Sequence, residues 1–113
     1  EAKYLRRISV HGKGEQVRPF IAVSDVARVI ESAIRGKLAD GLYNVAAENV
    51  AVGDIAALLR RIYPDLEVQA LDRHVRHGSL RLAANPKITK ILKERPGKIA
   101  DRIRELAKTL SFR

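Results

Sequence analysis

The sequence predicts a small mixed domain of the α/β or α+β class, with short strands and about four helices. Apolar residues recur at helical spacing in four segments, each bounded by a capping residue, a proline or a glycine. Short apolar runs typical of strands lie between them, in the order strand-strand-helix-strand-helix-strand-helix-helix. The chain has 113 residues, of which 46% are hydrophobic, so we expect one domain over 1–113 with one core.

The N-terminal segment predicts two short strands joined by a glycine turn. Residues 5–10 approximately alternate between apolar and polar side chains, which is typical of a strand with one buried face. Gly12 and Gly14 predict the turn that follows. Residues 17–23 form a second apolar run, in which Pro19 limits strand pairing to an edge position or a bulge.

The first long helix is predicted to begin at Ser24, a favourable N-cap residue, and to end at Gly36. Asp25 falls in its first turn, where the helix dipole favours a carboxylate, so we assign it a structural capping role. One face of this helix is apolar and is expected to be its buried face: Val26, Ala27, Ile30, Ala33 and Ile34. Residues 42–46 then predict a short buried strand.

The second half of the chain alternates in the same way. Its expected elements are a helix at 52–62, a strand at 67–71, a basic loop at 72–79, a brief extended segment at 81–84, a short helix from 86 to about 93, a turn at 94–97 and a final helix at 98–110. Pro64 ends the first of these helices. Asn85 caps the short helix, because the proline that follows it suits a first helical turn.

Positive charge is concentrated in the C-terminal third. Residues 1–72 carry ten basic and ten acidic side chains, whereas residues 73–113 carry twelve basic and three acidic ones, which accounts for the net charge of +9. This asymmetry indicates an anionic partner, either a small phosphate ligand or a nucleic acid, or else a solvated surface that aids solubility. Base-stacking aromatics are scarce near the basic part, where only Tyr63 and Phe112 occur, so nucleic acid is the less favoured partner.

Composition narrows the chemistry further. The absence of cysteine excludes disulfides and thiolate metal sites, and no apolar run approaches the ~20 residues of a membrane span, so we expect a cytoplasmic protein without membrane contact. The pair His74 and His77 lies among arginines without nearby carboxylates, so no metal site is expected. No catalytic constellation is evident. The chain begins at Glu1 and contains no methionine, which is typical of a fragment of a longer protein.

Arg18 is the strongest candidate for a functional residue. It follows the glycine turn, and a guanidinium fixed in such a position matches phosphate oxygens bidentately. The alternative is an edge-strand arginine that covers apolar surface with its stem. Arg73, Arg76 and Arg81 are further candidates, either closing over a phosphate or merely solvated. Tyr43 and Asn44 are expected to pack and pair rather than to bind.

These residues resemble a known family. Residues 12–27 fit G-x-G-x-Q-x-R-x-F-I-x-V-x-D-V-A, residues 41–45 fit G-x-Y-N-V, and V-x-x-I-A and a late helix follow. The combination is similar to the C-terminal substrate lobe of the NAD-dependent sugar-nucleotide epimerase/dehydratase family, the extended short-chain dehydrogenase/reductases. The similarity spans roughly residues 8–110. Pro19 departs from it, because the family has aspartate there, and Gly78-Ser79 stands for Gly-Asp.

The resemblance implies specific roles for individual residues. Arg18 matches the arginine that contacts the diphosphate of the sugar nucleotide, and Arg81 roughly matches a second nucleotide-contacting arginine. Ile8, Ser9 and Val10 match a strand whose backbone lies near the base. Lys87 matches a lysine at a helix start with a structural role.

The resemblance also implies what lies outside this chain. An N-terminal Rossmann domain would bind NAD or NADP and carry the catalytic tyrosine of an epimerase, dehydratase or reductase. This chain, as a C-terminal fragment, would bind the nucleotide sugar and be inactive alone. We also expect self-association through the surface that the Rossmann domain would cover. The alternative function is a basic nucleic-acid-binding or protein-interaction module that uses residues 73–113.

Overall fold

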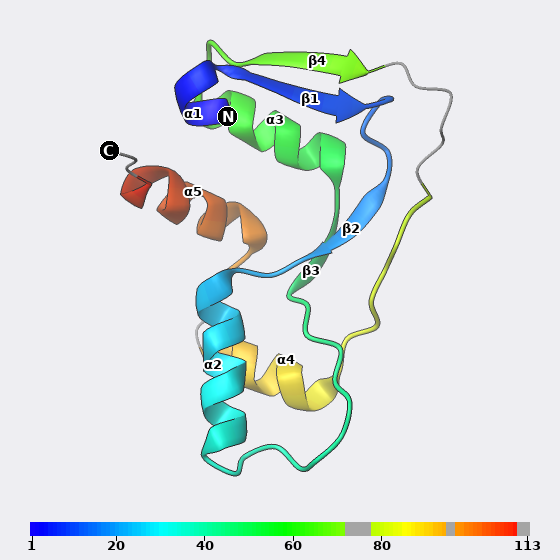
Figure 1. The fold of residues 1–113 in the computed structure, drawn as a ribbon, viewed down its shortest axis with the longest axis vertical. Coiled ribbons are helices and arrows are strands. Elements are labelled where there is room, and N and C mark those ends of the chain that lie inside the picture. Colours follow the sequence, from blue (N-terminus) through cyan, green and yellow to red (C-terminus); the bar gives the residue numbers. More distant parts are fainter. Residues whose placement is uncertain (72–77, 95–96, 111–113) are drawn as a thin grey trace.

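The computed structural model describes residues 1–71, 78–94 and 97–110. In these residues the elements are α1 (Ala2–Leu5), β1 (Arg7–His11), β2 (Val17–Phe20), α2 (Val23–Ile34), β3 (Glu48–Ala51), α3 (Val52–Ile62), β4 (Glu67–Leu71), α4 (Pro86–Lys93) and α5 (Ile99–Thr109). Figure 1 shows a small mixed α/β domain with two small sheets. The predicted class, a small mixed domain of short strands and helices, is confirmed. The short helix α1 was not predicted. No described helix is long and apolar enough to cross a bilayer.

The first sheet pairs β1 with β4 in parallel. Ile8 lies opposite Val68, and Val10 lies opposite Ala70. Helix α3 contacts this sheet, and Ala56, on α3, is buried together with Val10. Figure 1 shows β1, β4 and α3 grouped at one end of the molecule.

The second sheet pairs β2 with β3 in antiparallel orientation, and it corrects two predicted strands. Arg18 lies opposite Val50, and Pro19 lies opposite Asn49 in this two-stranded sheet, so the prediction that Pro19 sits at an edge is confirmed. Strand β2 ends at Phe20 rather than at residue 23. The strand predicted at 42–46 is wrong, since that segment has no strand partner and the next strand is β3.

Side-chain packing explains why residues 42–46 are apolar without being a strand. Tyr43 and Val45 pack against the small core between α2 and α4, which consists of Val29, Ile88 and Ile91. Asn44 donates a hydrogen bond from Nδ2 to the carbonyl oxygen of Ala83 at 3.3 Å. The expectation that Tyr43 and Asn44 pack and pair is therefore confirmed.

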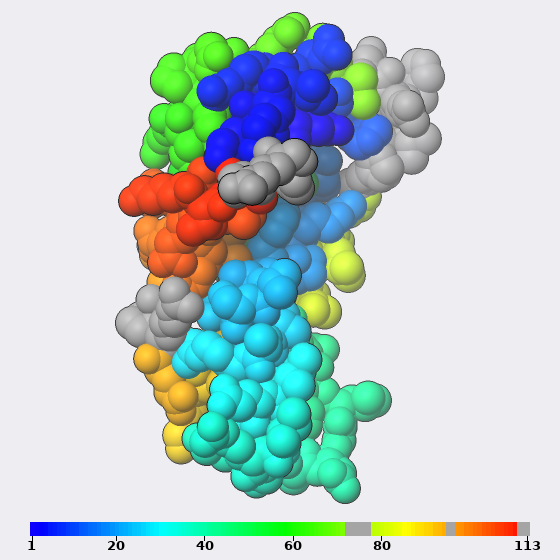
Figure 2. Space-filling view, turned by 60° about the vertical axis from the view of Figure 1, so that its left-hand side comes forward, coloured from blue at the N-terminus to red at the C-terminus, as the bar shows by residue number. Residues whose placement is uncertain are grey.

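Helix α2 buries a different face from the one predicted. Its buried residues are Asp25, Val29 and Ser32. The apolar face expected to be buried points largely outward: Ile30 is 55% exposed and Ile34 is 81% exposed. Figure 2 shows α2, in cyan, as an open ridge on the surface. The predicted cap is also wrong, because the N-cap is Ala22 and no side chain caps the helix.

Different residues accept the first backbone N–H groups of helices α4 and α5. Asn85 caps α4, accepting hydrogen bonds from the backbone N–H of Lys87 at 3.0 Å and of Ile88 at 3.5 Å, as predicted. At α5, the N–H of Ile99 donates to Oε2 of Glu48 at 3.2 Å, so strand β3 helps to fix the start of this helix. Part of the predicted turn at 94–97 lies outside the described ranges. Most of the basic loop predicted at 72–79 lies outside them too.

The molecule is more extended than its length requires. Its radius of gyration is 16.2 Å, whereas about 13 Å is expected for a compact domain of this size. Its accessible surface is 8486 Å², against about 6,200 Å² for a compact monomer. The excess is larger than the ~800 Å² that each partner buries in a standard interface. This surface is suited to further contacts.

Candidate functional site

Arg18 is held in place by backbone carbonyl groups. Its Nη1 atom donates to the carbonyl oxygen of Val17 at 2.8 Å and to that of Gly78 at 2.6 Å. Among the described residues, no carboxylate lies within ion-pair distance of it. The positive charge of Arg18 is therefore positioned by hydrogen bonds but not neutralised by a described carboxylate.

A segment that we call the strap, residues 78–84, runs beside the second sheet. Val17 makes two hydrogen bonds with it, from its N–H to Oγ of Ser79 and from the N–H of Leu80 to its carbonyl oxygen, both at 3.0 Å. Asn49 clamps Leu82 with two further bonds of 3.0 Å, one to its N–H and one to its carbonyl oxygen. The sheet thus holds the strap in an extended course.

The strap brings the two arginines predicted to contact a phosphate into one region of the fold. Arg81 lies between Leu80 and Leu82, both anchored to the sheet. Its side chain is exposed, and it has no polar partner within the part of the chain described. Because Arg18 contacts the strap at Gly78, two positive side chains arise from adjacent segments here.

The predicted base-contacting residues lie on the other sheet. Ile8 is half-buried, Ser9 is exposed and Val10 is buried, all on β1. Within the described ranges, no hydrogen bond or ion pair joins them to Arg18. The glycine turn is the covalent link between β1 and β2.

The turn itself secures helix α3. Gly14 adopts φ +73°, and a Cβ atom there would lie 2.8 Å from the backbone of Gly53. The N–H groups of Gly53 and Val52 donate to the carbonyl oxygens of Gly14 at 2.8 Å and Gln16 at 3.0 Å. Because the carbonyl groups of the turn and of Gln16 accept these bonds, this segment holds the start of α3 in place.

A buried ion pair joins two helices that the sequence gives no reason to connect. Asp25 of α2 is 5% exposed and Arg102 of α5 is 9% exposed. Oδ2 of Asp25 accepts from Nε of Arg102 at 3.2 Å. Arg28 lies 3.5 Å from the other oxygen of Asp25 and donates to the carbonyl oxygen of Ile91 at 2.9 Å. Asp25 lies in the first turn of α2 as predicted, but the capping role is wrong, because its side chain makes no cap hydrogen bond and pairs with Arg102 instead.

The remaining candidates have ordinary surroundings or cannot be placed. Nζ of Lys87 lies 6.0 Å from the centre of the Tyr43 ring. Arg73, His74, Arg76 and His77 lie outside the described residues. In the described ranges, no group of three or more histidine, aspartate or glutamate side chains could hold a metal ion.

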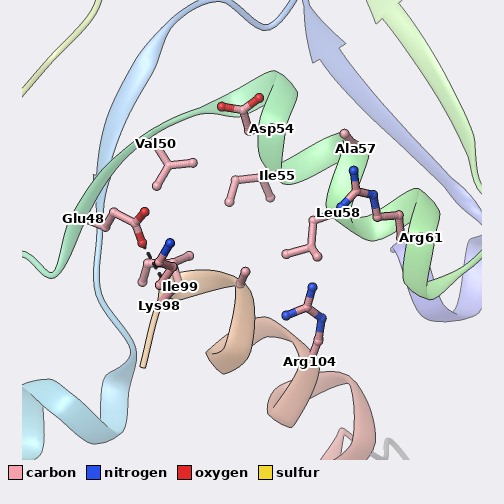
Figure 3. Close-up of a pocket in the computed structure, with 11 residues that line it drawn as sticks. Glu48, Val50, Asp54, Ile55, Ala57, Leu58, Arg61, Lys98, Ile99 and Arg104 are labelled. Atoms are coloured by element: carbon pink, nitrogen blue, oxygen red, sulfur yellow. Dashed lines mark hydrogen bonds between the residues drawn. The ribbon is translucent and has the colours of Figure 1, made fainter. Parts of the chain in front are cut away.

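Sequence reasoning missed a cavity of about 290 Å³ between α3 and α5. Figure 3 shows its labelled lining residues, which belong to β3, α3 and the first turns of α5. Val50, Ile55 and Leu58 are apolar, whereas Arg61 and Arg104 carry positive charge. Its residues come from three separate segments, so no single motif marks it.

Comparison of the chain with family models, with curated proteins and with solved structures finds no match. The resemblance described for residues 12–27 and 41–45 therefore rests on the sequence motifs themselves.

Proposed function

We propose that this chain is the substrate-binding lobe of an NAD-dependent sugar-nucleotide epimerase or dehydratase and that Arg18 grips the diphosphate of the substrate. The observation that carries the proposal is the setting of Arg18, which is held by two carbonyl groups and has no carboxylate partner among the described residues. Such an arrangement keeps the positive charge available to a ligand.

The donors left on Arg18 suit a phosphate group. A guanidinium has five N–H donors, and the bonds to Val17 and Gly78 use those of Nη1. The donors of Nε and Nη2 remain, and together they match two oxygens of one phosphate. Arg81 on the strap supplies a second positive charge for the neighbouring phosphate of a diphosphate.

The second component of the proposal is a domain that covers the outer face of α2. Val23 is 86% exposed, Ile30 55% and Ile34 81%, and all three lie on one side of the helix. An apolar face of this kind is typical of an interaction surface. In the proposed enzyme, the covering partner is the N-terminal Rossmann domain, which binds NAD or NADP and carries out hydride transfer.

This division of roles has a direct consequence for activity. The chain supplies binding energy at the nucleotide end of the substrate, which positions the sugar for chemistry elsewhere. The chain alone is inactive, and it binds nucleoside diphosphates weakly because it provides only one wall of the cleft.

Calorimetric titration with UDP and dTDP tests the proposal. We expect Arg18→Ala to lower the affinity at least about tenfold, because a charge-assisted bidentate contact is lost. Arg35→Ala is the matched control, since Arg35 is an exposed arginine paired with Glu31 on α2. Equal affinities for the unaltered chain and Arg18→Ala would rule out Arg18 as the diphosphate contact.

The alternative proposal is a basic interaction module in residues 73–113. The exposed lysines of α4, Lys90 and Lys93, favour it. Arg102 counts against it, because this basic residue is buried beside Asp25. Fluorescence anisotropy with labelled DNA and RNA distinguishes the two functions: binding that weakens steeply with added salt would favour the module, and no binding at moderate salt would exclude it.

A further inference from the structure

The cavity between α3 and α5 has charged groups of opposite sign on different parts of its wall. Arg61, from the last turn of α3, and Arg104, from α5, both line it. Glu48 and Asp54 line it nearer the start of α3. Figure 3 shows the two guanidinium groups on one side of the cavity and the two carboxylates on the other, with Lys98 beside Glu48 and apolar side chains between.

The carboxylates of this cavity already have roles in the fold. Oε2 of Glu48 accepts the N–H of Ile99 and so fixes the start of α5. Asp54 lies in the first turn of α3, where the helix dipole stabilises a negative charge. Among the described residues, neither carboxylate forms an ion pair with Arg61 or Arg104. The positive end of the cavity is therefore not neutralised by its negative end.

The arginines, in contrast, remain available to a ligand. Arg61 is exposed and has no hydrogen-bond or ion-pair partner in the described part of the chain. Arg104 pairs with Asp101 at 3.1 Å, but both side chains are about half exposed, and an ion pair of this kind adds little stability. An anion placed between the two guanidinium groups would gain contacts from both.

The apolar wall indicates what such an anion should carry. Leu58 is 8% exposed and Ile99 is 5% exposed, so firmly packed core residues form part of the lining. The volume of about 290 Å³ lies near the lower end of the range found for small-molecule pockets. A hydrated inorganic ion would leave this apolar wall uncovered, whereas a small organic group would cover it.

We propose that this cavity is a binding site for a small organic anion, with a phosphate or carboxylate head between Arg61 and Arg104 and a compact apolar body against Leu58 and Ile99. The site differs from the Arg18 region, because neither Arg18 nor any residue of the strap lines it, although Val50, which lies opposite Arg18 in the second sheet, does. The proposal goes beyond the proposed function and does not depend on it.

Titration with phenyl phosphate, followed by methyl NMR of the full chain, tests this site. Phenyl phosphate should shift the methyl resonances of Ile55, Leu58 and Ile99. Phenol lacks the phosphate head, and inorganic phosphate lacks the apolar body. Each should bind at least about tenfold more weakly than phenyl phosphate. Saturable binding that leaves these three residues unshifted would overturn the proposal, as would no binding at millimolar ligand.

Substitutions on the same helices distinguish the site from general charge attraction. Arg61→Gln and Arg104→Gln should each lower the affinity about tenfold. Arg60→Gln is the matched control, because Arg60 is the neighbouring exposed arginine of α3 and does not line the cavity. An equal loss in Arg60→Gln and Arg61→Gln would show that net charge alone attracts the ligand.

A fourth variant separates this site from the proposed function. Arg18→Ala should leave the affinity for phenyl phosphate and the three methyl shifts unchanged. If Arg18→Ala abolished them, the anion would bind at the nucleotide region and the separate site would be excluded. Loss of UDP binding with retention of phenyl phosphate binding would support both proposals.

Discussion

Arg102 donates from Nε to Oδ2 of Asp25 over 3.2 Å, and this contact links α5 to α2 in the interior of the protein. The guanidinium also packs on Gly97, where a Cβ atom would lie 3.2 Å from Cζ of Arg102. Val29 is the buried apolar residue of α2, and Ile99 is that of α5. The ion pair is therefore a main link between α5 and α2, while Glu48 fixes the start of α5 separately.

Removing one partner of this pair should destabilise the protein strongly. Arg102→Ala leaves the carboxylate of Asp25 buried without its Nε contact, and such a loss costs about 3–5 kcal/mol. Arg104→Ala is the control, because its pair with Asp101 is exposed and its loss costs about 1 kcal/mol or less. Urea unfolding measures both free energies. Similar free energies of unfolding for the two variants would contradict the structural role of Arg102.

The contact between Gly14 and Gly53 leads to a second prediction about stability. In Gly14→Ala the new Cβ atom would lie 2.8 Å from the backbone of Gly53 at φ +73°, so both strain and overlap oppose it. In Gly12→Ala, with φ +59° and no atom within 4 Å, strain alone opposes it.

We expect Gly12→Ala to cost about 1 kcal/mol and Gly14→Ala to cost roughly 1–3 kcal/mol more. Thermal unfolding of the two variants provides the comparison. A larger loss of stability in Gly12→Ala than in Gly14→Ala would show that the close contact between Gly14 and Gly53 does not hold α3 in place.

The strap should depend on Asn49. Asn49→Ala removes both hydrogen bonds to Leu82 and leaves two backbone groups unpaired, at a cost of about 1–3 kcal/mol. The amide of Leu82 should then exchange with solvent faster, and UDP should bind more weakly because Arg81 is less well positioned. Asn44→Ala, which removes one longer bond of 3.3 Å to Ala83, should have a smaller effect on the exchange of Leu82.

The outer face of α2 should promote self-association of the isolated chain. We expect the apparent mass in sedimentation equilibrium to rise with concentration and to fall toward the monomer in Ile30→Glu, because a charge in an apolar contact is costly. Lys37→Glu alters charge just beyond the same helix without changing its apolar face and serves as the control. A clean monomer at high concentration for the unaltered chain would count against this prediction.

Local signals in the sequence predicted the elements whose ends depend on local chemistry. Helix α3 and strand β4 have the predicted bounds. Asn85 caps α4 as expected, because the cap involves only the residues that follow it. The cap of α4 therefore needs no distant segment, whereas β4 was predicted from its apolar run although its partner, β1, is distant in sequence.

Elements that depend on distant partners were predicted less well. Strand β3 forms because Val50 pairs with Arg18 of β2, and the residues around Val50 do not by themselves predict that pairing. The apolar periodicity of α2 predicted the helix but not its buried face, because periodicity does not say whether this chain or another covers an apolar face. Asp25 and Arg102 are 77 positions apart, so their contact could not be predicted from either neighbourhood.

Of the candidate site, the sequence indicated the residue with a local signal but not the contacts that come from distant segments. The position of Arg18 after the glycine turn marks it as a candidate, and in the structure it lies beside the strap that carries Arg81. The carbonyl group of Gly78, which helps to hold Arg18, lies 60 positions away and could not be anticipated. The cavity that contains Arg61 and Arg104 combines three segments and has no local signature.

The most direct test of the central claim observes the side chain of Arg18 itself. In ¹⁵N-resolved NMR, the Nε–H resonance of Arg18 should shift on titration with UDP, in step with the binding isotherm. The corresponding resonance of Arg35 should stay in place. Saturable UDP binding that leaves the Arg18 resonance unchanged would contradict the assignment of Arg18 as the diphosphate contact.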